Sequence, residues 1–269
     1  RRFGRLDRRP EPRPPGSSQR LARVPMRLTV DGQSVFVYTG NSEHIHNQSA
    51  VVFIHGAGLD HTVWVLPSRY FSRHGFNVIA PDLPGHGRSS GVGLNKIETM
   101  ADWIIALLDA SGVEQASIVG HSMGSLVALA TAGRYPDRCR SLCLLGSSIP
   151  MSVTDELMNS ARNNEHAAID MLTYWGYSTQ AQLGGNENPG LWMVGGTLRL
   201  WERARPGVIH SGLQACHTYE AGMDHARAVR CRTQLILGER DIMTPVRYGR
   251  ELAAKIEGSQ TTIVKGSAH

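Results

Sequence analysis

The sequence predicts an α/β domain built on a mostly parallel eight-stranded sheet, with helices covering both faces. Two observations indicate this fold class. Short apolar runs alternate with longer helical patterns across short loops, as the crossovers between parallel strands require. The alternation stops between residues 147 and 230 and then resumes, which indicates a helical segment inserted into the domain.

The elements follow one another in a regular order. Asp31-Gly32 is a two-residue turn signal, so we expect the first two strands to pair as an antiparallel hairpin. Several later strands are continuous apolar runs, typical of strands that are buried on both faces. The expected strands lie near residues 26–30, 33–39, 50–54, 77–80, 116–119, 141–145, 233–237 and 260–264. The expected helices lie near residues 62–74, 96–110, 123–134 and 246–257.

Length and composition agree with this fold class. A chain of 269 residues suits one α/β domain with an insertion, which buries a sizeable core. No apolar run approaches the ~20 residues that a membrane-spanning helix needs, so we expect no membrane span. The cysteines form no C-x-x-C pair, which favours reduced thiols at Cys139, Cys143, Cys216 and Cys231. We expect a cytoplasmic location from this cysteine pattern.

The positive charge of the chain is concentrated at its N-terminus. Residues 1–27 contain nine arginines and two acidic residues, whereas the net charge of the whole chain is only +5. Residues 1–25 are also rich in proline and poor in apolar residues, so we expect a disordered tail. This tail has three interpretations: an anchor for an anionic surface, a targeting peptide, or sequence upstream of a natural start at Met26. Because the basic charge belongs to this tail, we expect no nucleic-acid partner.

The most specific motif is a G-x-S-x-G pentapeptide between a predicted strand and a predicted helix. It reads Gly120-His121-Ser122-Met123-Gly124. A serine in such a sharp turn adopts a strained backbone conformation, and the flanking glycines let the neighbouring chain pass closely. The hydroxyl of Ser122 then projects above the sheet, near a helix N-terminus that favours developing negative charge.

This turn resembles the nucleophile elbow of the α/β-hydrolase family, in which an acid and then a histidine follow the serine along the chain. Asp241 follows the strand at 233–237 and stands where the family's acid lies. His269 follows the strand at 260–264, in the loop that carries the family's base. The resemblance therefore implies a catalytic triad of Ser122, His269 and Asp241. Glu239 is the alternative acid and His86 the alternative base.

Two further segments are similar to motifs of this family. The sequence His55-Gly56-Ala57-Gly58 resembles the H-G-x-G segment, which implies an oxyanion hole formed by the backbone N–H groups of Ala57 and Met123. The sequence Asp82-Leu83-Pro84-Gly85-His86-Gly87-Arg88-Ser89 resembles the D-x-P-G-x-G-x-S loop, which is structural. The histidines at His55 and His121 flank these loops, and we expect both to be structural hydrogen-bond partners.

The resemblance also implies a domain organisation. We expect a tail at 1–25, the first part of an α/β-hydrolase core at 26–146, a helical cap at 147–230 and the second part of the core at 231–269. Methionines and tryptophans of the cap favour an apolar, adaptable pocket, namely Met151, Met158, Met171, Trp175, Trp192, Met193 and Trp201. Members of the family continue past the histidine with a further helix, so the chain resembles a fragment that lacks this helix.

The implied function is that of a carboxylesterase-like serine hydrolase. It would cleave a small to medium carboxylic ester or a related small-molecule acyl substrate through an acyl-enzyme, without a cofactor. His44 and His46 are spaced like a metal-binding pair but have no third ligand nearby, so we expect no metal site. The alternatives are carbon–carbon bond hydrolysis, perhydrolysis or acyl transfer on the same triad. A non-catalytic binding protein of the same fold is a further alternative.

Overall fold

The computed structural model describes residues 26–269, apart from residues 46–47, 186–189 and 191. The predicted tail at 1–25 and His46 of the histidine pair lie outside the described residues.

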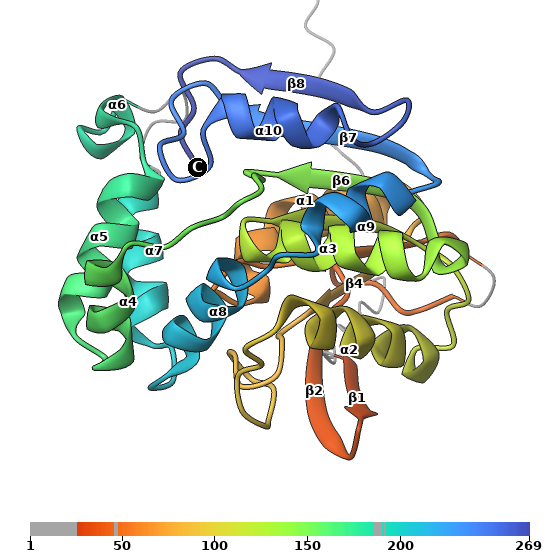
Figure 1. Cartoon of the computed structure of the whole chain (residues 1–269). Helices are drawn as coiled ribbons and strands as arrows, with labels where there is room; N and C mark the ends of the chain where they lie inside the picture. Colours follow the sequence, from red (N-terminus) through yellow and green to blue (C-terminus); the bar gives the residue numbers. More distant parts are fainter. Residues whose placement is uncertain (1–25, 46–47, 186–189, 191) are drawn as a thin grey trace, which may run out of the picture.

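An eight-stranded sheet forms the centre of the described chain (Figure 1). Its strands are β1 (Met26–Val30), β2 (Gln33–Tyr38), β3 (Ala50–Ile54), β4 (Asn77–Pro81), β5 (Ala116–His121), β6 (Cys139–Leu145), β7 (Arg232–Gly238) and β8 (Gln260–Val264). Their order across the sheet is β1-β2-β4-β3-β5-β6-β7-β8. β2 pairs antiparallel with β1 and β4, and every other neighbouring pair is parallel. The predicted fold class and its eight strands are therefore confirmed.

Helices cover both faces of this sheet. The first face carries the short helix η1 (His61–Trp64) and α1 (Val65–Arg73), which pack on β3 and β4. The other face carries α2 (Ile97–Ala110), α3 (Met123–Arg134), α9 (Gly222–Ala228) and α10 (Val246–Ala253). A short helix, η2 (Pro136–Arg138), leads into β6. Figure 1 shows α2, α3 and α9 side by side.

The observed bounds of two helices differ from the expected ones. The helix expected at 62–74 is divided, because the Asp60 side chain accepts a 2.8 Å hydrogen bond from Thr62 N and begins a tighter first turn as η1. The helix expected at 246–257 ends at Ala253. Beyond it, Lys255 N and Ile256 N donate to carbonyls three residues earlier, which is a turn geometry and not that of an α-helix.

Helix α3 lies at the centre of the domain. All ten residues from Met123 to Ala132 are buried, which explains why this stretch is apolar or small on every side. Small residues let neighbouring helices approach closely: a Cβ atom added to Gly133 would lie 2.5 Å from the carbonyl oxygen of His225 in α9. The residue after β5 is therefore attached to the most deeply packed helix of the fold.

The chain between β6 and β7 forms a succession of helices. These are α4 (Asp155–Arg162), α5 (His166–Gly176), α6 (Thr179–Gln182), α7 (Met193–Glu202), α8 (Val208–His217) and the core-packed α9. Helices α4, α5, α7 and α8 share a small apolar core of their own, which includes Leu157, Leu172, Trp201 and Leu213. Figure 1 shows α4, α5 and α7 stacked beside one edge of the sheet, with the C-terminal residue on the same side.

Among the described helices, none combines the length and the apolar character that crossing a membrane requires.

The turn between β5 and α3 has a strained backbone. Ser122 adopts φ 55° and ψ −125°, a conformation that L-residues rarely occupy. A Cβ atom added to Gly120 would lie 2.0 Å from Gly124 O, and one added to Gly124 would lie 2.2 Å from Ile54 O in β3. Both glycines are therefore required because the backbones of β5, α3 and β3 are in direct contact around the serine.

We expect Gly124→Ala to lower the free energy of unfolding by about 3 kcal/mol or more, since the added methyl group meets the β3 backbone. Gly196→Ala is the matched control, because Gly196 lies inside α7 with nothing near its added Cβ atom. This control is expected to gain roughly 0.5–1 kcal/mol. Urea denaturation of both variants measures the difference, and an unchanged stability of Gly124→Ala would contradict the close approach of α3 to β3.

Candidate active site

The predicted site residues come together at one edge of the sheet. Parallel strands all end at the same edge, and the loops that follow β3, β5, β7 and β8 carry Ala57, Ser122, Asp241 and His269. Ala57, Ser122 and His269 line a common pocket. Asp241 and Met123 are buried behind it.

Ser122 is held in the pocket through its backbone. Its N–H donates to Leu145 O at the end of β6 (3.0 Å), and its carbonyl accepts from Ser125 N (2.8 Å) and Ser125 Oγ (2.6 Å). The loop after β3 lies against it, since a Cβ atom added to Gly56 would be 3.3 Å from Ser122 Cβ. These contacts fix the direction in which the serine hydroxyl leaves the turn.

His269 and Asp241 form a buried pair. His269 Nδ1 and Asp241 Oδ2 are 2.8 Å apart, and both side chains are almost wholly buried. An ionised carboxylate can only accept hydrogen bonds, so Nδ1 carries the proton and Nε2 of a neutral imidazole is left with a lone pair. Among the described residues, His269 Nε2 has no hydrogen-bond partner, and no hydrogen bond joins it to Ser122.

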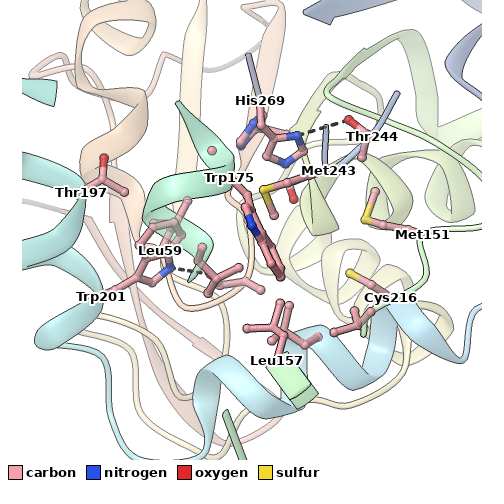
Figure 2. Close-up of a pocket in the computed structure, with 18 of the residues that line it drawn as sticks. Leu59, Met151, Leu157, Trp175, Thr197, Trp201, Cys216, Met243, Thr244 and His269 are labelled. Carbon is pink, nitrogen blue, oxygen red and sulfur yellow. Dashed lines mark hydrogen bonds between the residues drawn. The ribbon is translucent and has the colours of Figure 1, made fainter. Parts of the chain in front are cut away.

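The Asp241 carboxylate accepts three further hydrogen bonds from its own loop. Oδ1 accepts from Met243 N (2.9 Å) and Thr244 N (2.8 Å), and Oδ2 accepts from Thr244 Oγ1 (2.6 Å). Thr244 Oγ1 is also 3.2 Å from His269 Nδ1, as Figure 2 shows. Burial alone would raise the pKa of Asp241, but the hydrogen bond and charge of His269 and the Thr244 donors hold this pKa below its ordinary value. Sequence reasoning did not identify this role of Thr244.

The ring of His269 packs against the end of β6. A Cβ atom added to Gly146 would lie 3.0 Å from both Cε1 and Nδ1 of His269, so only glycine leaves room for the imidazole. The His121 ring lies on another side, with a centroid distance of 4.8 Å. Burial and the neighbouring His269 lower the pKa of His121 to about 3. His121 therefore stays neutral near pH 7 and is no competitor for a proton-transfer role.

The Gly56–Ala57 peptide, which carries the predicted oxyanion N–H, is held by two hydrogen bonds to its carbonyl oxygen. Leu83 N donates to His55 Nε2 (3.1 Å), so His55 Nδ1 carries the proton and donates to Gly56 O (2.9 Å). Leu59 N also donates to Gly56 O (3.2 Å). The structural role expected for His55 is therefore confirmed, and its hydrogen bond orients the peptide plane whose other side bears Ala57 N–H.

Two of the helices inserted between β6 and β7, α7 and α8, contact the loop after β3 at Ala57. Sequence reasoning missed both contacts. Trp201 in α7 donates its indole N–H to Ala57 O (3.0 Å). In α8, a Cβ atom added to Gly212 would lie 2.7 Å from Ala57 Cβ and 2.9 Å from Met123 Sδ. A tryptophan and a helical glycine carry no sequence signal for such a role, because their partners lie far away along the chain.

The loop from Asp82 to Ser89 braces the β3 and β4 side of the site. Asp82 is fully buried and accepts from His61 N (2.8 Å), His61 Nδ1 (2.7 Å) and Arg88 N (2.8 Å). Asp60, His61 and Asp82 lie close enough to hold a metal ion, but their ligand atoms are already used in hydrogen bonds within this loop and to Thr62. The structure therefore gives the cluster a bracing role.

The two alternative residues lie apart from the triad geometry. His86 is buried against His55, does not line the pocket of Ser122, and has its pKa lowered to about 3 by burial and by His55. Glu239 accepts from Gly266 N (2.8 Å) and has no contact with His269 among the described hydrogen bonds. The geometry therefore favours Asp241 and His269 over both alternatives.

The pocket has a volume of about 540 Å³ and is enclosed jointly by the sheet edge and the inserted helices. Of the seven methionines and tryptophans expected near it, Met151, Trp175 and Trp201 line the pocket. Figure 2 shows Met151, Leu157, Trp175 and Met243 around this space. The remaining four do not line it, and Trp192 is largely exposed.

Comparison with known proteins gives a consistent family. Residues 49–181 match the family model of the alpha/beta hydrolase fold. A pimeloyl-[acyl-carrier protein] methyl ester esterase of Neisseria meningitidis is 31% identical over 201 residues, which cover 71% of this chain and 75% of that protein. An enol-lactonase from Burkholderia xenovorans LB400 has the same fold, with a TM-score of 0.78 at 20% identity, covering 89% of this chain and 91% of that chain.

Other relatives match over a shorter length. A 2-hydroxymuconate semialdehyde hydrolase of Pseudomonas sp. (strain CF600) is 35% identical over 133 residues, or 45% of this chain and 46% of that protein. The chain spans less than half the length of several curated relatives that it matches.

Thr244→Val removes one donor from Asp241 and preserves the shape of the side chain. We expect it to lower the free energy of unfolding by roughly 1–2 kcal/mol near neutral pH. The loss should shrink as the pH falls below about 4, because a lowered carboxyl pKa stabilises the folded protein only while the carboxyl is ionised.

Urea denaturation at about pH 7 and about pH 3 checks this expectation. Thr261→Val, at an exposed position of β8, is the control and should stay within roughly 0.5 kcal/mol of the parent protein at both pH values. An equal loss for Thr244→Val at both pH values would mean that Thr244 acts through packing and not through the charge of Asp241.

Proposed function

This chain belongs to the α/β-hydrolase family, and we propose that within it the protein is a serine hydrolase that cleaves a small to medium carboxylic ester or a related acyl substrate. The observation that carries this proposal is the buried hydrogen bond to Asp241 from His269, which lines the same pocket as Ser122. A serine, an imidazole with a bare Nε2 and an orienting carboxylate are the parts that acyl transfer through a serine requires.

The reaction begins with the serine hydroxyl. His269 Nε2 accepts the proton of Ser122 Oγ while that oxygen attacks the carbonyl carbon of the substrate. The two side chains line one pocket without a hydrogen bond between them, and such contacts commonly tighten only when substrate is bound. The protonated imidazole, stabilised by Asp241, then gives its proton to the leaving alcohol. Water hydrolyses the acyl-enzyme by the same two proton transfers in reverse order.

The negative charge of the tetrahedral intermediate needs donors that are already in position. We assign this role to the backbone N–H groups of Ala57 and Met123. Support comes from the fixed Gly56–Ala57 peptide and from the position of Met123 at the buried N-terminus of α3, where the helix dipole favours an anion. We further assign to the segment containing helices α4–α8 the role of a cap, because α4, α5, α7 and α8 line the pocket together with Ser122.

A second candidate is the hydrolysis of a carbon–carbon bond on the same triad. It is favoured by the 2-hydroxymuconate semialdehyde hydrolase that is 35% identical to part of this chain. Turnover of a dienol ketone that exceeds turnover of every ester tested would favour this candidate over ester cleavage.

We expect Ser122→Ala to lower kcat/KM for p-nitrophenyl esters by roughly 1,000-fold or more, because the acyl-enzyme can no longer form. Ser152→Ala is the matched control, since Ser152 also lines the pocket but has no part in the proposed mechanism. A fluorophosphonate should label the parent protein and the control but not Ser122→Ala. Equal labelling of both variants would exclude Ser122 as the nucleophile.

Trp201→Phe keeps an aromatic ring but removes the N–H donor to Ala57 O. We expect kcat to fall by about 10-fold with little change in KM, because the oxyanion donor is misplaced mainly in the transition state. Trp175→Phe is the comparison, as Trp175 lines the pocket without a described hydrogen bond, and its effect should fall on KM. The same kcat loss in both variants would assign the effect to pocket shape.

A further inference from the structure

The pocket wall contains no carboxylate, ammonium or guanidinium side chain among the described residues, since no aspartate, glutamate, lysine or arginine lines it. Its titratable groups are His121, Tyr177, Cys216 and His269. A side chain of this wall that carries a full charge opposite to that of a substrate would therefore have to be one of these four.

Three of the four are neutral near pH 7. Burial and His269 lower the pKa of His121 to about 3, and burial raises the pKa of the Cys216 thiol to about 12. Burial also raises the pKa of the Tyr177 hydroxyl. The fourth, His269, is already paired with the negative charge of Asp241. The wall thus offers no free positive charge to an anionic substrate.

Several polar groups of the wall are occupied within the protein, and the Trp64 indole N–H, a neutral donor, is left without a partner among the described residues. The Trp201 indole N–H donates to Ala57 O, and the Thr244 hydroxyl donates to Asp241. The Tyr177 hydroxyl is hydrogen-bonded to Thr197 and lies 3.3 Å from Met193 O. These groups have little capacity left to solvate a carboxylate that has lost its water.

The side of the pocket formed by the helices between β6 and β7 is largely apolar. Leu157 from α4, Leu172 from α5 and Leu213 from α8 are almost fully buried and belong to one apolar cluster with Trp201. Trp175 and Met151 extend the same surface, as Figure 2 shows. A cavity of about 540 Å³ with such walls is in the size range of pockets that hold compact organic ligands.

We propose that the acyl group accepted by this pocket is uncharged and apolar, of medium length, and carries no carboxylate or phosphate. This inference rests on the serine hydrolase function proposed above. It separates the chain from the relative named as a 2-hydroxymuconate semialdehyde hydrolase, because hydroxymuconate semialdehyde is itself a carboxylate.

Three esters of matched length test the proposal. They are p-nitrophenyl hexanoate, the p-nitrophenyl methyl diester of adipic acid, and mono-p-nitrophenyl adipate, which ends in a carboxylate. We expect kcat/KM for the carboxylate ester to be roughly 100-fold or more below that of both neutral esters, since an unpaired carboxylate loses its hydration in the pocket. Similar values for the carboxylate ester and the methyl diester would overturn the inference.

A new cation in the wall provides the reverse test. Met151→Lys places an ammonium group on a flexible stem where Met151 lines the pocket, and Met151→Gln is the matched neutral variant. We expect Met151→Lys to raise the kcat/KM ratio of carboxylate ester to methyl diester by about 10-fold or more. The ratio should stay near the parent value in Met151→Gln, and an equal rise in both variants would contradict a charge effect.

Binding to the Ser122→Ala protein separates this inference from the proposed function. Trp175 and Trp201 line the pocket, so tryptophan fluorescence can report binding of dimethyl adipate and monomethyl adipate without turnover. We expect the monoanion to bind at least about 10-fold more weakly, and equal affinities would overturn the inference. Absence of both ester turnover and fluorophosphonate labelling in the parent protein would reject the serine hydrolase function, whereas the two affinities still decide the charge preference.

Discussion

The geometry of this site depends on the close approach of three backbones around one serine. β3, β5 and α3 are in contact at Gly120 and Gly124, and the strained backbone of Ser122 is held between them. Strain of this kind costs about 1–3 kcal/mol and persists only where the surrounding packing over-determines it. The burial of α3 from Met123 to Ala132 supplies that packing. The position of the hydroxyl is thus set by the core and not by contacts of the side chain itself.

Sequence analysis predicted the parts of the molecule that depend on local patterns. The eight strands and the mostly parallel arrangement follow from apolar periodicity and short loops, whereas the grouping of Ser122, Asp241 and His269 was what the family resemblance implied. The resemblance of four short motifs to one family added the expected chain order of these residues. The helix bounds at 62–74 and 246–257 were less accurate, because turn geometry at helix ends depends on a few hydrogen bonds.

The contacts that complete the site depend on tertiary packing and loop shape, and local sequence patterns do not predict them. Trp201 and Gly212 reach Ala57 from helices whose position follows from tertiary packing, and no periodicity predicts which indole meets which carbonyl. Thr244 stands three residues after Asp241, but its donation to the carboxylate depends on the shape of the loop. The neutrality of the pocket is a property of a surface assembled from distant segments. Such properties depend on the tertiary structure, so they cannot be predicted from local sequence patterns alone.

The path of the inserted helices has a consequence for how the protein can diverge. They leave the sheet after β6 and return to it at β7, and these two strands are direct neighbours in the sheet. A helical insertion between two neighbouring strands can be lengthened, shortened or exchanged without altering the order of the strands in the sheet. Natural selection can therefore alter the pocket wall while the chemistry of the sheet edge is inherited unchanged. The contacts of Trp201 and Gly212 with Ala57 set the limit on that freedom, since any replacement has to support the same loop.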